Sequence, residues 1–314
     1  MMSWPPCCAP YRSAESRMVD LIPPDVRNRL KSLRLVTRRA VGSHGIGLHQ
    51  SHSRGAGLEF AQYRAYERGD ELRQIDWKLY ARSDKFFVRE AERESPVAVW
   101  ILMDASASMT QADAARPDYS RFDAAKGLAA CIADLAMRQG DRFGWMALSD
   151  QGLALLPPAS GARQRDRLLL ELIGVNAVGG FAPEDQLGPV WERIGARDLV
   201  ILLSDCFDPG AVELAEKLAA AGRETLLIEM LTVAERDFPF DGGYRFRDPE
   251  TGEELLADGP ALRSEFLARF GAARDALHDR LDAVGIRYAT HMLDQPIDVP
   301  LRRLFGAHEA AEYQ

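Results

Sequence analysis

The sequence predicts an α/β protein in which a doubly wound, mostly parallel sheet carries an appended N-terminal subdomain. From residue 97 onward, short apolar runs alternate with amphipathic stretches, which is the pattern of strands and helices in a parallel sheet. The chain has 314 residues, 46% of them hydrophobic, which is enough for one large domain with a sizeable core and an appendage. The distribution of charge separates the same two parts.

Charge divides the chain near residue 95. Residues 1–95 hold 17 basic and 12 acidic side chains, a net charge of +5, whereas residues 96–314 hold 22 basic and 35 acidic ones, a net charge of -13. Two differently charged parts are therefore expected. A basic part can indicate nucleic-acid binding, but no basic run interleaved with aromatic residues supports it here. We favour solvated faces and local ion pairs.

Neither a membrane-spanning segment nor a secretory signal is expected. The longest uninterrupted apolar run covers only residues 97–103, whereas a spanning helix needs about 18 to 20 residues. The cysteines have neither the spacing of a metal knuckle nor that of a disulfide framework; they are Cys7, Cys8, Cys131 and Cys206. We therefore expect a cytoplasmic protein.

Residues 18–95 are expected to form the basic subdomain, after a Pro-rich stretch over 1–17 that is either a disordered tail or a mis-assigned start. An amphipathic basic helix is predicted over 25–39, where apolar residues recur at helical spacing. Because its apolar stripe is thin, packing on the neighbouring domain is favoured over a membrane or a nucleic acid. Residues 41–57 predict a polar loop. Its histidines have no carboxylate or cysteine nearby, so zinc is not favoured; they are His44, His49 and His52.

The stretch 58–94 alternates charged with aromatic and aliphatic residues, which predicts strands that carry paired charges. Arginine can form bidentate hydrogen bonds with carboxylates, which lysine cannot replace. The candidate pairs join three acids to three arginines: Glu59, Asp70 and Asp76 to Arg64, Arg73 and Arg82. Composition alone thus predicts a structural ion-pair network.

The large domain is expected over 96–305, followed by a tail at 306–314. Strands are predicted from apolar runs at 97–103, 143–148, 153–156, 199–203, 225–231 and 286–292. Amphipathic spacing predicts helices near 121–138, 163–173, 185–195, 211–221 and 262–284. Ser120 and Asp123 have the spacing of a capping box, and Gly285 is expected to end the last helix. Turn signals within 236–259 predict a small hairpin insertion.

Polar side chains follow two of the predicted strands, where open parallel sheets bind their ligands. Asp104, Ser106 and Ser108 follow the first strand of the large domain, and Asp205 follows the strand at 199–203. An all-oxygen set with few carboxylates suits Mg²⁺ or Mn²⁺. Each residue alone could be a turn or capping residue. Their position at two strand ends instead predicts a metal site.

The run from Asp104 to Ser108 resembles the DxSxS signature of von Willebrand factor A domains. The preceding block resembles the prokaryotic family called domain of unknown function 58, over the whole stretch from about residue 20 to 305. The residues that carry this resemblance are Gly57, Glu59, Phe60, Arg64, Tyr66, Gly69, Asp70, Arg73, Ile75, Asp76, Trp77, Ala81, Arg82, Val88 and Glu90. The resemblance implies a von Willebrand factor A-like domain and makes the block a partner-binding or signature surface.

In von Willebrand factor A domains the two serines contact the metal and the aspartates act largely through water. A threonine from a third loop completes the set, and a carboxylate of the partner takes the open position. The expected place of that threonine, residues 178–181, has no hydroxyl in this chain. The resemblance therefore implies a partial metal-ion-dependent adhesion site. It also implies a MoxR-type AAA+ ATPase as partner, in a chaperone-like or complex-assembly role.

Three functions are open on the sequence. The favoured one is a non-enzymatic protein-interaction module. The second is a magnesium-dependent phosphohydrolase of the haloacid-dehalogenase kind, which needs a second carboxylate where this chain has Ser106. The third is a metal-free scaffold that binds its partner through the signature block. Cys206 beside Asp205 suggests a nucleophile, but no base is placed near it, so a small buried residue is favoured.

Overall fold

The computed structural model describes residues 21–36, 62–66, 75, 77–90, 98–247 and 250–306. Among these residues, no helix combines the length and the apolar composition that are needed to cross a membrane.

Six strands form the central sheet in the order β10-β7-β6-β3-β4-β5. All neighbours are parallel except β4 and β5, which form an antiparallel hairpin. Their bounds are β3 Ala98–Asp104, β4 Arg142–Ser149, β5 Gly152–Ala159, β6 Leu199–Ser204, β7 Glu224–Leu231 and β10 Arg287–Met292. Counted along the domain, the order is that of a doubly wound sheet, with its switch point between β3 and β6. The predicted fold class and all six predicted strands are confirmed.

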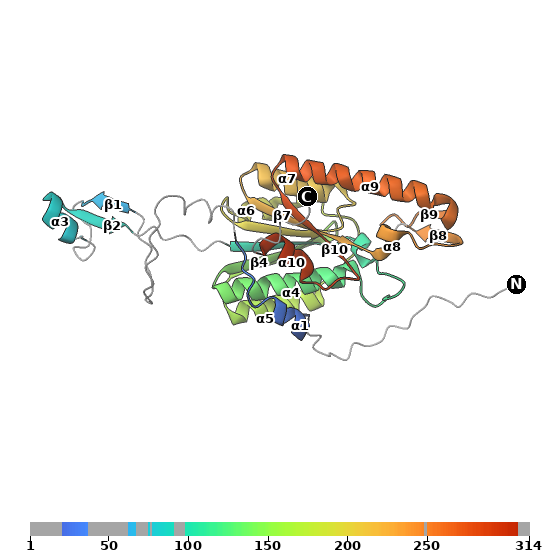
Figure 1. Cartoon of the computed structure of the whole chain (residues 1–314), viewed down its shortest axis with the longest axis horizontal. Coiled ribbons are helices and arrows are strands. Elements are labelled where there is room, and N and C mark those ends of the chain that lie inside the picture. The colour runs from blue at the N-terminus through green and yellow to red at the C-terminus, as the bar shows by residue number, and fades with distance from the viewer. Residues whose placement is uncertain are drawn as a thin grey trace.

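Helices cover both faces of this sheet (Figure 1). One face packs on α1, α4, α5 and α10, and the other on α6, α7 and α9. The bounds are α1 Pro24–Arg29, α4 Arg121–Gln139, α5 Ala162–Gly174, α6 Gly188–Arg193, α7 Pro209–Ala220, α9 Gly259–Ala283 and α10 Val299–Phe305. Side chains of β3 alternate between the two cores, since Val99 and Ile101 face the α4 side and Trp100 faces the α7 side. Burial on both faces is why this strand is uninterruptedly apolar.

Local sequence signals place several boundaries correctly. The capping box of α4 is present, with the Ser120 side chain bonded to the Asp123 backbone and the Asp123 carboxylate returning to the Ser120 backbone. The predicted hairpin insertion is β8 Gly243–Arg247 paired with β9 Glu254–Asp258. Gly285 follows the end of α9 with a φ of +75°, which an L side chain rarely adopts.

The helix expected over 25–39 is wrong in length, because α1 ends at Arg29. Leu35 lies in a non-helical segment. The Gln139 side chain accepts a hydrogen bond from the Leu35 backbone N–H at 2.6 Å and donates one to the Leu35 carbonyl at 3.1 Å. These tertiary bonds and the burial of Leu35 outweigh helical periodicity. The expected packing on the neighbouring domain is confirmed, since Val26 and Leu30 belong to the main core.

The signature block also contains a helix that the alternation pattern did not predict. Strands β1 Gln62–Ala65 and β2 Phe87–Glu90 pair antiparallel, but α3 Trp77–Ser83 lies between them in the sequence. Trp77 and Tyr80 are three residues apart and therefore share a helix face. Both rings contact Phe86, at 6.4 and 4.4 Å between centroids. This aromatic packing explains a helix where alternating polarity suggested a strand.

Several further short elements differ from expectation. The helix predicted near 185–195 is divided into a 3₁₀ turn, η3 Glu184–Gln186, and α6, with Pro189 in the first turn of the α-helix. Neither α8 Val233–Asp237 nor α10 was predicted, since each is too short for its periodicity to be visible. A second 3₁₀ turn, η2 Ala107–Thr110, follows β3.

Candidate functional site

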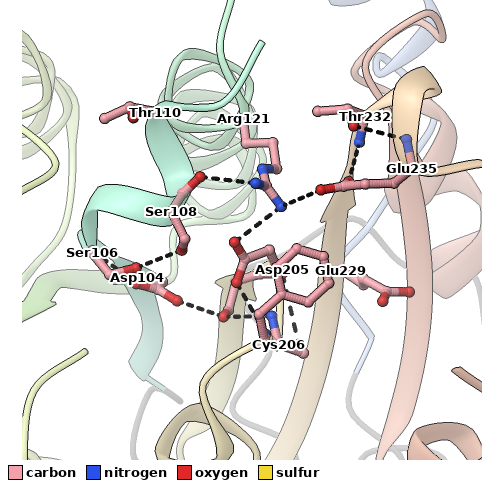
Figure 2. A network of polar contacts seen from close by, with 12 residues as sticks. Asp104, Ser106, Ser108, Thr110, Arg121, Asp205, Cys206, Glu229, Thr232 and Glu235 are labelled. Atoms are coloured by element: carbon pink, nitrogen blue, oxygen red, sulfur yellow. Dashed lines mark hydrogen bonds and ion pairs between the residues drawn. The ribbon is translucent and has the colours of Figure 1, made fainter. Parts of the chain in front are cut away.

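The two strands at the switch point end in polar residues that meet in one buried cluster (Figure 2). Asp104 is the last residue of β3, Ser204 is the last residue of β6, and Asp205 follows it. All three side chains are fully buried. Because β3 and β6 are adjacent and parallel, their carboxyl ends lie side by side.

The loop after β3 folds around the carboxylate of Asp104. Its Oδ1 accepts a hydrogen bond from the Ser106 backbone N–H at 2.9 Å. The hydroxyls of Ser106 and Ser108 are 2.9 Å apart and share a hydrogen bond. Both serines are buried, and η2 begins directly after Ser106. The structure thus brings the three residues of the DxSxS run together.

Ser204 joins the two strand ends directly, and sequence reasoning missed it. Its hydroxyl donates to Asp104 Oδ2 at 2.6 Å and accepts from the Cys206 backbone N–H at 3.0 Å. The sequence signal was a hydroxyl immediately before Asp205 at a strand end. Since Ser204 occupies one carboxylate oxygen of Asp104 and the Ser106 backbone the other, Asp104 is fixed in orientation.

The enclosed position of Asp104 raises its pKa. Burial, together with the nearby negative charge of Asp205, raises its pKa from 3.8 to about 6. The hydrogen bonds from Ser204 and Ser106 act in the opposite direction and only partly offset these effects. A cation close to Asp104 would therefore relieve an unfavourable charge.

Arg121 is the charged partner of the second strand end. Its Nη1 lies 3.0 Å from Asp205 Oδ2 and 3.2 Å from Glu235 Oε1, and its Nη2 donates to the Ser108 backbone carbonyl at 2.9 Å. Arg121 is only 1% exposed. Figure 2 shows its guanidinium between the DxSxS loop, Asp205 and Glu235. Burial raises the pKa of Glu235 despite the opposing effect of Arg121.

Sequence reasoning missed Arg121 because charged residues are ordinary in the first turn of a helix. Ser120 caps α4, so Arg121 is the first residue of the helix. The backbone N–H of Arg121 donates to the Gln111 carbonyl at 2.9 Å, and this bond holds the start of α4 next to the end of η2. Glu235 is placed in turn by a capping box with Thr232 at the start of α8. Only the three-dimensional arrangement shows that these two helix starts face the same strand end.

The third loop lies where the resemblance placed it. Ala105 accepts from the Val178 backbone N–H at 2.8 Å, and the Ala107 N–H donates to the Gly179 carbonyl at 2.8 Å. The loop therefore contacts the DxSxS run through backbone groups. Gly179 has a φ of +69°, and an added Cβ would collide with the Asp150 carboxylate. No hydroxyl is present at 178–181 to complete a metal site.

The oxygen donors at the switch point fit a hydrated magnesium ion in part. Adjacent ligands of an octahedral ion with bonds of about 2.1 Å are about 3 Å apart, and the Ser106 and Ser108 hydroxyls are 2.9 Å apart. The charged carboxylate of Asp104 adjoins them. Asp205 already has Arg121 as a counter-charge, so it suits a role through water better than direct contact. Within the described ranges, this site included, no group of three or more His, Cys, Asp or Glu side chains could hold a metal, so the serine hydroxyls would have to serve as ligands.

The structure describes only part of the predicted signature surface. Trp77 is 58% exposed on α3, and Arg82 is exposed on the same helix. Arg64 lies in β1, but the position of its side chain falls outside the description. The remaining predicted residues lie outside the described residues, and so do the expected ion pairs; they are Glu59, Asp70, Arg73 and Asp76. The Trp77 ring contacts those of Tyr80 and Phe86 and is otherwise open to solvent.

Two chemical alternatives find little support in the geometry. Ser106 occupies the position of the proton-shuttling carboxylate, and its hydroxyl is bonded to Ser108. Asp208, which together with Asp205 could imitate a later acidic motif of such a phosphohydrolase, instead caps α7 by accepting from the Gly210 N–H at 2.7 Å. Burial raises the pKa of the Cys206 thiol to about 12, so it is protonated at neutral pH and is a poor nucleophile.

A doubly wound sheet with polar side chains at its switch point defines an α/β domain of the kind that binds a ligand or partner at the carboxyl ends of its strands. The chain belongs to the family described as "Protein of unknown function DUF58", whose model matches residues 62–276. This confirms the membership that the signature block indicated.

Its curated relatives include the uncharacterized proteins Rv1480 of Mycobacterium tuberculosis and Mb1516 of Mycobacterium bovis. Each is 29% identical over 266 residues, which cover 82% of this chain and 81% of the relative. Among solved structures, BatB from Bacteroides thetaiotaomicron is 16% identical with a TM-score of 0.36, covering 60% of this chain and 98% of BatB. The SpRpn10 VWA domain is 12% identical with a TM-score of 0.40, and the match covers 67% of this chain and 95% of that domain.

Proposed function

We propose that the protein is a non-enzymatic protein-interaction module that docks a partner at the carboxyl ends of its strands. The observation that carries this proposal is the gathering of Asp104, Ser106, Ser108 and Asp205 in one cluster at the switch point. These residues would hold Mg²⁺ or Mn²⁺. When bound, the ion would supply an open coordination position for a carboxylate of the partner. Ser204 and the Ser106 backbone N–H fix the orientation of Asp104. The serine at position 106 cannot act as a general acid.

A MoxR-type AAA+ ATPase is the partner that we propose, in a chaperone-like or complex-assembly role. The support for it is membership of the family, together with a site that offers charge recognition without a catalytic acid or an ionised thiol. The cytoplasm is the proposed location, and its support is the cysteine pattern.

The replacement Asp104→Ala is expected to abolish magnesium-dependent capture of a purified MoxR-type ATPase from the same organism. Asp104 is the charged residue next to the two serine hydroxyls, so its loss removes the main attraction for the ion. Calorimetric titration with Mg²⁺ and Mn²⁺ should show the same loss. The exposed Asp185→Ala serves as the matched control and should bind as the unmodified chain does. Unchanged capture by Asp104→Ala would contradict the metal-bridged form of the proposal.

A metal-free scaffold is the second candidate, and the Arg121–Asp205 pair favours it, because a protein cation already neutralises one of the proposed metal ligands. In that case the signature surface makes the contact. Arg82→Ala should then weaken capture at least about tenfold, which is about 1.4 kcal/mol, and equally in magnesium and in EDTA. Arg82 is exposed, so the melting temperature should stay unchanged. Capture that depends on magnesium and is not weakened by Arg82→Ala would exclude the metal-free scaffold.

A further inference from the structure

A large cleft lies beside the candidate site, between α1, α4 and the 111–119 segment on one side and α8, the β8–β9 hairpin and α9 on the other. Its volume is about 2110 Å³, whereas small-molecule pockets typically have about 300–1,000 Å³. An α-helix about 10 Å in diameter occupies roughly 400 Å³ per turn, so the cleft has the volume of roughly five turns. Its size suits a segment of a protein.

Aromatic side chains line the hairpin side of this cleft in an unbroken series of ring contacts. Outside the cleft lining, the ring of Phe207, two residues after Asp205, lies 6.4 Å from that of Phe270, where the series begins. It continues through centroid distances of 5.6, 4.6, 4.9 and 4.9 Å along Phe270, Phe266, Phe238, Phe240 and Tyr244. Figure 1 shows the hairpin and the start of α9 together beside α8. The cleft also adjoins the candidate site, because Glu235, which contacts Arg121, is among its lining residues.

Part of this aromatic surface is open to solvent. Tyr244 is 37% exposed and Phe207 is 46% exposed, and Leu255 on β9, which also lines the cleft, is 62% exposed. Exposed apolar side chains gathered beside a cleft, as Tyr244 and Leu255 are here, are a feature of interaction sites in folded proteins. Aromatic residues are also enriched at the centres of protein interfaces. The cleft thus offers both the room and the chemistry for an apolar helix face.

The rim of the cleft is acidic. Among its lining residues are seven carboxylates and three arginines. Arg29 and Arg269 pair with Asp25 and Glu265 within the lining, and Glu235 and Asp294 pair with Arg121 and Arg236 outside it. This leaves three carboxylates against one arginine: Asp113, Asp118 and Asp123 against Arg116. Asp118 and Asp123 are exposed on the rim beside Tyr119. The net charge favours a basic occupant.

We infer that the cleft binds a basic amphipathic helix of the partner protein, with its apolar face on the aromatic series and its lysine or arginine residues toward the acidic rim. The inference rests on the proposed function only in assigning the cleft to a protein partner. The metal cluster is not among the cleft's lining residues, so helix binding does not need it.

The test uses the full chain and two dye-labelled peptides of about five helical turns, or about 18 residues. Both carry leucine at helical spacing; one carries lysine and the other glutamate at every polar position. Fluorescence anisotropy should show that the lysine peptide binds at least about tenfold more tightly. Leu255→Glu should remove this binding, whereas Leu170→Glu, at a comparably exposed leucine on α5 outside the cleft, should not. Asp118→Lys should weaken it and Asp185→Lys should not.

Several outcomes would overturn the inference: equal affinity for both peptides, no binding of the lysine peptide, or indifference to Leu255→Glu. Sedimentation of the chain alone provides a further one, since self-association that Leu255→Glu removes would assign the cleft to a second copy. Asp104→Ala should bind the lysine peptide like the unmodified chain. Peptide binding without magnesium-dependent capture would therefore contradict the metal proposal and leave the cleft assignment intact.

Discussion

Replacing Arg121 with methionine is expected to lower the free energy of unfolding by about 3 to 5 kcal/mol, the cost of breaking a buried ion pair on one side. The guanidinium is the cation within 3.2 Å of both Asp205 and Glu235, and Asp205 is completely buried. Methionine keeps much of the length and apolar volume, so the loss would report mainly on charge. Urea denaturation at neutral pH measures it.

Arg236→Met is the matched control for this variant. Arg236 also pairs with two carboxylates, Asp237 and Asp294, but all three side chains are more than 40% exposed. Its loss should cost less than about 1 kcal/mol, because exposed ion pairs contribute little. A second variant, Arg121→Met with Asp205→Asn, should recover part of the stability by removing the stranded charge. If Arg121→Met costs no more than Arg236→Met, the buried pair does not support the site as described.

The same Arg121 shows why the site was only partly predictable. Asp104, Ser106, Ser108 and Asp205 could be predicted because a parallel sheet fixes where its strand ends lie, so position after a strand translates directly into position in space. Arg121 lies 17 residues after Asp104 and reaches the site from the start of a helix, through a segment whose path no periodicity describes. Contacts of this kind depend on tertiary packing.

The fold divides along a similar line. Strand β3 was predictable because burial on both faces demands a continuous apolar run, and α4 because a capping box and a wide apolar stripe coincide. For α1 and α3, contacts with residues outside the helix decide where the helix forms. Gln139 bonds the backbone of Leu35 beyond the end of α1, and Phe86 packs against Trp77 on α3. Local periodicity cannot include those partners. Short elements therefore account for most of the differences.

Acidification is expected to destabilise the protein through His291. This side chain is fully buried on β10, and burial lowers its pKa from 6.5 to about 4. The nearby carboxylates of Asp294 and Asp298 raise the pKa but do not cancel the effect of burial. The unfolded chain binds a proton near pH 6.5 and the folded chain only near pH 4. Stability is therefore lost as the pH falls through this interval, by about 3 kcal/mol at pH 4.

The variant His291→Leu should remove this dependence. Within the part of the chain that the structure describes, neither ring nitrogen of His291 has a hydrogen-bond partner, so leucine should be tolerated at pH 7. At pH 4 the variant should be more stable than the unmodified chain by up to about 3 kcal/mol. The carboxylates titrate in both proteins, so the difference between their urea curves isolates the histidine. His278→Leu should show a smaller difference, because His278 is 28% exposed.

Parallel stability curves for His291→Leu and the unmodified chain between pH 7 and pH 4 would contradict this account. They would mean that the folded protein accepts a proton on His291 without penalty, which requires a carboxylate to reach the ring. Asp298 is held by Arg29 through two hydrogen bonds of 2.8 Å, and Asp294 pairs with Arg236. Either carboxylate would have to leave its arginine to compensate the charge. That exchange would itself cost stability, which is why we expect the curves to diverge.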